Sequence, residues 1–66
     1  MTLTLNGSSM TLEEGLTVAA LLQRLQLPRE RVAIERNGSI LPKAAYEETR
    51  LAEGDRLEIV QFVGGG

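Results

Sequence analysis

Alternating apolar and polar residues predict two hairpins and a final strand. The N-terminal TLTLN alternates leucine with polar residues, and a second alternation follows Asn6-Gly7, a dipeptide typical of a tight hairpin turn. Residues 32–41 repeat this arrangement around Asn37-Gly38, with Pro42 ending the short return strand. RLEIVQFV, residues 56–63, predicts a last strand that faces the core with Leu57 and Ile59.

One segment between the hairpins has the period of a helix. Its apolar residues recur at i, i+3, i+4 and i+7 and therefore share one face: Val18, Leu21, Leu22 and Leu25. Thr17 is a good N-cap because its hydroxyl accepts from an early backbone N–H, and Pro28 places the helix end near residues 26–27. The following segment, 43–50, is irregular or a short helical turn, with Tyr46 packing inward.

The order of these elements predicts an α+β fold. One amphipathic helix covers one face of a mixed sheet of four to five strands, and each alternating strand offers a single apolar face. The helix is the crossover between the first and last strands, which then lie parallel at the centre. This is the β-grasp (ubiquitin-like) arrangement, with a domain at residues 1–62 and a flexible glycine tail at residues 63–66.

Composition excludes several classes of function. The chain has no cysteine and no histidine, which removes the thiolate nucleophile, the commonest general base and the commonest metal ligand. A net charge of −2 with one Tyr and one Phe does not suit a nucleic-acid binder. The N-terminus is not a signal peptide, and no apolar run approaches a membrane span. We therefore expect a cytoplasmic protein that is not an enzyme, binds no metal and works with partner proteins.

The sequence ends in FVGGG, and this tail is the candidate chemical site. Glycines make a strand thin enough to enter a tunnel, and four residues extend at most about 14 Å. The terminal carboxylate is ionised at neutral pH and is a nucleophile toward an activated phosphate, which allows an acyl-adenylate to form. The competing interpretation is an unstructured end or a cloning linker.

The chain resembles the ThiS family, the sulfur carrier proteins of thiamine biosynthesis. The resemblance covers essentially the whole sequence and rests on four segments: TVAALLQRL (17–25), VAIERNGSILPKAAY (32–46), LAEGDRLEIV (51–60) and FVGGG (62–66). The terminal diglycine is shared with other ubiquitin-like carriers, whereas the short length and the middle segments favour the thiamine carrier.

The resemblance implies a specific chemistry for the tail. An adenylating enzyme of the ubiquitin-activating type would use ATP to form an acyl-adenylate on Gly66, and this chain itself would bind no cofactor. Sulfur from a cysteine desulfurase would replace AMP and leave a thiocarboxylate, from which thiazole synthase would take sulfur. The family's diglycine maps onto Gly65 and Gly66, and Gly64 is compatible with the same entry into a partner active site.

Three further functions and one surface remain open from the sequence. The chain also fits the small subunit of molybdopterin synthase, a β-grasp interaction module with an inert tail, or a modifier conjugated to lysines. Val60 and Phe62 lie opposite the core-facing side of the last strand, so we predict that they and Val63 form a docking patch, against the alternative of an ordinary sheet surface. The Glu13-Glu14 and Glu47-Glu48 pairs fit solvated surface better than acid–base catalysis.

Overall fold

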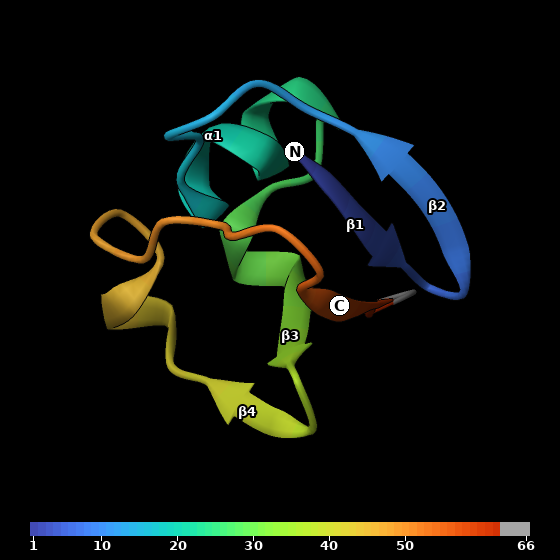
Figure 1. The fold of residues 1–66 in the computed structure, drawn as a ribbon. Coiled ribbons are helices and arrows are strands. Elements are labelled where there is room, and N and C mark those ends of the chain that lie inside the picture. The colour runs from blue at the N-terminus through green and yellow to red at the C-terminus, as the bar shows by residue number, and fades with distance from the viewer. Residues whose placement is uncertain (63–66) are drawn as a thin grey trace.

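The computed structural model describes residues 1–62 and contains five strands, one α-helix and two short 3₁₀ segments (Figure 1). In chain order the elements are β1 (Thr2–Leu5), β2 (Ser8–Thr11), α1 (Val18–Arg24), η1 (Arg29–Arg31), β3 (Val32–Arg36), β4 (Ser39–Leu41), η2 (Lys43–Ala45) and β5 (Arg56–Gln61).

The strands form one mixed sheet in the order β2-β1-β5-β3-β4. β1 and β5 run parallel, with Leu5 opposite Leu57, and the other three pairs of neighbouring strands are antiparallel. The last strand of the chain is therefore the central strand of the sheet. This arrangement confirms the predicted β-grasp fold, including the parallel pair joined through the helix.

Both predicted Asn-Gly turns are present between antiparallel strands. Asn6 and Gly7 have φ values of 50° and 84°, and Asn37 and Gly38 have values of 52° and 88°. Two consecutive positive φ angles give the turn the twist of the flanking strands, and Asn-Gly tolerates them better than other pairs. The turns set the registers in which Leu3 lies opposite Met10, on β1–β2, and Glu35 opposite Ile40, on β3–β4.

The asparagine side chains of these turns also bind the central strand. The Asn6 amide accepts from the Ile59 N–H at 2.8 Å and donates to the Ile59 carbonyl at 3.2 Å, beyond the end of β1. The Asn37 side chain accepts from the Arg56 N–H at 2.9 Å. Each amide thus supplies β5 with hydrogen bonds where a neighbouring strand has turned away, which satisfies backbone groups that would otherwise lack partners.

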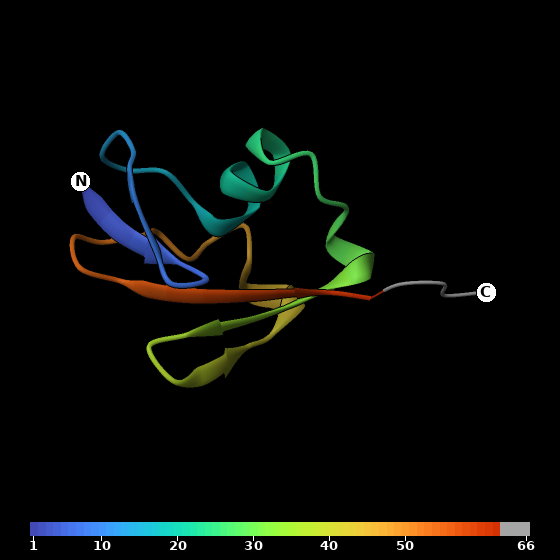
Figure 2. The same cartoon turned by 90° about the vertical axis from the view of Figure 1, so that its right-hand side faces the viewer.

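α1 covers one face of the sheet and begins as predicted (Figure 2). The Thr17 hydroxyl accepts from the Ala20 N–H at 3.1 Å, which confirms the N-cap. Two more early N–H groups, of Val18 and Ala19, donate to carbonyls of the segment 46–49. The helix ends at Arg24, slightly earlier than predicted, because Gln26 turns to a φ of 60°.

The core lies between α1 and the sheet. It includes Leu57 and Ile59 of β5, as predicted. Its buried apolar residues are Leu3, Leu12, Leu16, Val18, Leu21, Leu22, Val32, Ile34, Tyr46, Leu51, Leu57 and Ile59. Tyr46 is 1% exposed, as predicted from the sequence. Leu25, at the end of the helical stripe, packs at the margin of this core and is only partly buried.

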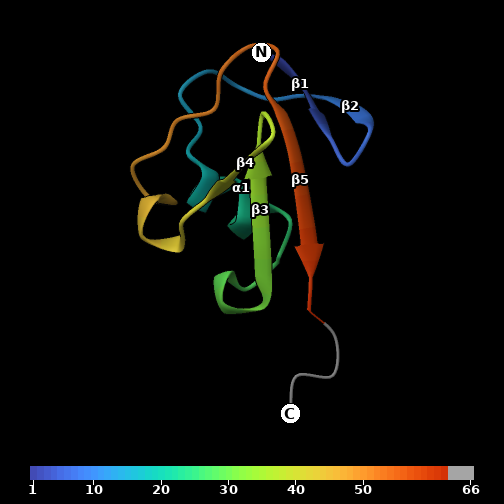
Figure 3. The same ribbon diagram turned by 90° about the horizontal axis from the view of Figure 1, so that it is seen from below.

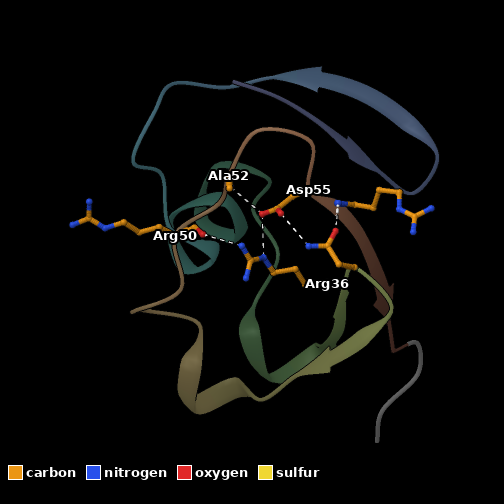
Figure 4. A network of polar contacts seen from close by, with 6 residues as sticks. Arg36, Arg50, Ala52 and Asp55 are labelled. Carbon is orange, nitrogen blue, oxygen red and sulfur yellow. Dashed lines mark hydrogen bonds and ion pairs between the residues drawn. The ribbon is translucent and has the colours of Figure 1, made fainter.

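A buried carboxylate joins the β3–β4 hairpin to the start of β5 (Figure 4). Asp55 is 5% exposed and accepts from Arg36 Nε at 3.0 Å, Asn37 Nδ2 at 3.1 Å and the Ala52 N–H at 2.9 Å. Burial alone raises the pKa of the Asp55 carboxyl, but these hydrogen bonds and the Arg36 charge outweigh it and leave that pKa below its ordinary value. The ionised carboxylate is therefore part of the folded structure.

Candidate functional site

The central strand β5 leads directly to the predicted tail, so its C-terminal end is the structural base of the candidate site. Gln61, the last residue of β5, lies opposite Val32 at the start of β3. The Phe62 N–H continues this pairing by donating to the Arg31 carbonyl at 2.8 Å. Figure 3 shows this end of β5 beside the start of β3, away from both Asn-Gly turns. The predicted site residues Val63, Gly64, Gly65 and Gly66 lie outside the described residues.

A lysine holds the turn against which β5 ends. Lys43 Nζ donates to the Arg29 carbonyl at 2.8 Å and to the Val32 carbonyl, so it bridges both ends of η1. The same ammonium group lies 6.0 Å from the Tyr46 ring centroid and 6.0 Å from that of Phe62. Lys43 is thereby connected to Phe62, the last described residue, in two ways: through η1 and through the Phe62 ring.

Tyr46, one of the two aromatic residues near Lys43, is buried in the core. Burial raises the pKa of the Tyr46 phenol, which is therefore neutral at physiological pH. The Arg29 guanidinium carbon lies 5.7 Å from the same ring centroid, and Arg29 also pairs with Glu47 at 3.5 Å. We refer to Arg29, Arg31, Lys43, Tyr46 and Phe62 as the exit cluster, because together they fix the point at which the described chain leaves the sheet.

Replacing Lys43 by methionine should loosen the exit cluster without unfolding the domain. The variant loses two charge-assisted hydrogen bonds at a solvent-exposed position, so we expect the free energy of unfolding to fall by about 0.5–1.5 kcal/mol. The Phe62 amide should exchange with deuterium roughly tenfold faster. Arg50→Met is the matched control because the Arg50 side chain extends into solvent (Figure 4). Unchanged exchange at Phe62 in Lys43→Met would contradict this role of the lysine.

The sheet face opposite α1 exposes the residues predicted as a docking patch. Val60 is 58% exposed and Phe62 is 51% exposed, so both lie on the surface as predicted. Ile40 on β4 is 76% exposed and belongs to the same side as its cross-strand neighbour Glu35. The sequence interpretation missed Ile40, although the alternation with the partly buried Leu41 was a usable signal.

The acidic pairs lie on the surface, as the sequence favoured. Arg24 donates two hydrogen bonds to Glu13, and these bonds hold the pKa of the Glu13 carboxyl at about 2. Glu14 lies 3.4 Å from the Met1 amino group. Glu13 and Glu14 thus each have a cation beside them, as solvated surface carboxylates commonly do.

A groove of about 510 Å³ lies between α1 and η1. Its polar lining includes Gln23, Arg29 and Glu47. Its lining has no nucleophile beside a general base, because the Thr17 hydroxyl already caps the helix.

Residues 1–62 contain neither a cluster of potential metal ligands nor a helix that could cross a membrane. No group of three or more acidic side chains is close enough together to hold a metal ion. No helix in this range combines the length and apolar character that crossing a membrane requires.

The sequence and the structure both match known proteins. The model of the ThiS family matches residues 3–66. The sulfur carrier protein ThiS of Bacillus subtilis is 42% identical over 65 residues, which cover 97% of this chain and 98% of that protein. The crystal structure of the thiamine biosynthesis protein ThiS from Geobacter metallireducens superimposes with a TM-score of 0.84 at 39% identity, and each chain is covered completely.

A second group of relatives is much longer. A thiazole synthase of Paramagnetospirillum magneticum is 44% identical over 66 residues, and one of Magnetococcus marinus is 39% identical over the same length. This chain spans 20% of the length of each of these two proteins. A family match over residues 3–66 and near-complete coverage of a short relative lead to one conclusion: the chain belongs to the ThiS family.

Proposed function

We propose that this chain is a sulfur carrier of thiamine biosynthesis and that the carboxyl group of Gly66 carries the sulfur. The observation that carries the proposal is the match to the Bacillus subtilis sulfur carrier protein ThiS, which includes 98% of that protein. In this role the chain is a substrate of other enzymes and not itself a catalyst.

The chemistry has two steps at one carbon atom. In the first step, a carboxylate oxygen of Gly66 attacks the α-phosphorus of ATP on an adenylating enzyme, and pyrophosphate leaves. In the second step, a hydrosulfide equivalent derived from cysteine by a desulfurase attacks the acyl carbon, and AMP leaves. The product is a thiocarboxylate, whose sulfur thiazole synthase then accepts. Gly64 and Gly65 serve this chemistry by presenting no side chain to the partner active sites.

The central position of β5 in the sheet supports this role. β5 is the central strand and is paired on both sides, by β1 and β3, so neighbouring strands hold both of its edges. The exit cluster adds hydrogen bonds at its end. A firmly held base limits the conformational entropy lost when a partner binds this end of the chain, because β5 and Phe62 are already fixed.

Docking of partners is assigned to the exposed residues next to the tail. Val60 and Phe62 are large apolar side chains on an open sheet face, and Val63 follows them in the sequence. Exposed apolar patches commonly mark protein interfaces. We propose that this patch contacts the partner enzymes while the glycines enter their active sites.

Mass spectrometry of the C-terminal peptide tests the proposal directly. The chain is incubated with ATP, its adenylating enzyme and a sulfur source, and replacement of oxygen by sulfur should raise the mass of the peptide containing Gly66 by about 16 Da. A parallel reaction without ATP should leave the mass unchanged. An unchanged mass with ATP, under conditions in which another ThiS protein is converted, would reject the proposal.

A further inference from the structure

Two carboxylates lie directly opposite each other on the open face of the sheet. Glu35 on β3 is in register with Glu58 on β5, and both side chains are exposed. Like charges in directly opposed cross-strand positions destabilise a sheet. The arrangement therefore lowers the stability of the isolated domain, and folding alone does not account for it.

The pair borders a shallow depression of about 220 Å³. Its lining consists of Glu35, Gly38, Arg56 and Glu58. Gly38 leaves the depression open, since a Cβ atom there would meet nothing within 4 Å. Arg56 contributes one positive charge, so the lining keeps an excess of negative charge. Among residues 1–62, no ion pair involves either glutamate.

Exposed apolar residues flank the acidic pair on this face. Ile40 lies across from Glu35 and is 76% exposed. Val60 lies two residues after Glu58 on the same face of β5 and is 58% exposed. Phe62, itself a member of the exit cluster, is 51% exposed and extends the apolar surface beyond the end of β5. The face therefore offers apolar side chains that a partner can cover and carboxylates that a complementary positive charge of that partner can pair with.

We propose that this surface, formed by Glu35, Ile40, Glu58 and Val60, docks on thiazole synthase, and that a lysine or arginine of that enzyme lies between the two carboxylates. The inference rests on the proposed function and specifies its docking patch. Thiazole synthase is the chosen partner because two relatives join this module to the rest of a thiazole synthase in one chain. A cation fits the site because it relieves the repulsion between Glu35 and Glu58.

This mechanism makes stability and binding respond in opposite directions. In the free domain, replacing either glutamate by glutamine removes the repulsion, so the domain should become more stable. In the complex, the same replacement leaves the partner's cation with one carboxylate instead of two, so binding should weaken. If either glutamate served only to stabilise the fold, its replacement would lower the stability of the domain and leave the affinity for the partner unchanged.

Binding is measured between the unloaded chain and purified thiazole synthase by fluorescence anisotropy. Glu35→Gln and Glu58→Gln should each raise Kd by at least about tenfold at low salt, and this difference should shrink as salt is added. Thermal unfolding of the same variants should shift upward by about 1–5 °C. The matched control is Glu48→Gln, an exposed carboxylate outside the sheet, which should bind as the parent does.

The outcome separates this inference from the proposed function. Parent-like affinity of both glutamine variants would overturn it, and so would an equal loss of affinity in Glu48→Gln. Because the unloaded chain is used, the result does not depend on sulfur transfer. A failure to form the thiocarboxylate would therefore reject the carrier proposal and leave the docking result intact.

Discussion

Replacing Gly65 and Gly66 by alanine is expected to slow thiocarboxylate formation by at least about 100-fold. On the proposed mechanism, the two added methyl groups have to enter partner sites that accept a strand without side chains, and a displacement of about 1 Å at the reacting carbon has an effect of this size. Alanine also restricts the backbone angles that glycine allows. The rate is followed by the mass of the C-terminal peptide over time.

The fold of this variant should be unchanged, because both positions follow the last described strand. Circular dichroism and thermal unfolding of the variant should match those of the parent. The control carries alanine at Ser8 and Ser9, two exposed residues of the edge strand β2, and should accept sulfur at the parent rate. If the variant at Gly65 and Gly66 also reacts at the parent rate, the tail is not the chemical site. The alternative of an interaction module with an inert tail would then be favoured.

Replacing Asp55 by asparagine is expected to lower the free energy of unfolding by about 2–3 kcal/mol at pH 7. The asparagine amide would present N–H donors where Arg36, Asn37 and the Ala52 N–H already donate to a carboxylate. At least one buried donor would then lose its partner. Arg36 is 30% exposed, so water compensates part of this loss and keeps the effect below that of a fully buried ion pair.

This loss is large for so short a chain. A domain of 66 residues has a total stability of about 3–10 kcal/mol, so the variant should lose at least about a fifth of its stability. Chemical denaturation at pH 7 measures the change. The control is Glu48→Gln, which removes an exposed carboxylate and should change the stability by less than about 0.5 kcal/mol. A variant at Asp55 with parent-like stability would show that the buried network is dispensable.

The same residue predicts how the parent responds to acid. The folded state holds the pKa of Asp55 below its unfolded value, so its stabilising effect is complete above the unfolded pKa. This contribution disappears as the pH falls through the lower pKa of the folded state. The stability of the parent should therefore decline below about pH 4, and Asp55→Asn should decline less steeply in the same range. Identical acid profiles would contradict the assignment.

Local patterns in the sequence determined most of the elements, because each depends on neighbouring residues. The alternation around Asn6-Gly7 and Asn37-Gly38 predicts both hairpins, and the turn geometry is intrinsic to those dipeptides. The spacing of apolar residues after Thr17 predicts α1 and its buried face. A single helix then restricts the sheet to one covered face, from which the β-grasp topology and the exposure of Val60 follow.

Contacts between distant segments were decided only by the tertiary structure. The sequence gives no local sign that Asn6 binds Ile59, that Asp55 joins Arg36 to Asn37, or that Lys43 spans η1. These partners lie 11 to 53 residues apart, and their hydrogen bonds exist because the fold brings their elements together.

The candidate site likewise has one part that the sequence predicts and another that only the folded structure reveals. The proposed role of the terminal glycines rests on the sequence alone, because residues 63–66 lie outside the described residues. The opposition of Glu35 and Glu58 depends on the register between β3 and β5, strands joined by no hairpin. No local pattern fixes that register, because it results from packing both strands against the same helix. The acidic centre of the docking surface therefore becomes visible only in the folded sheet.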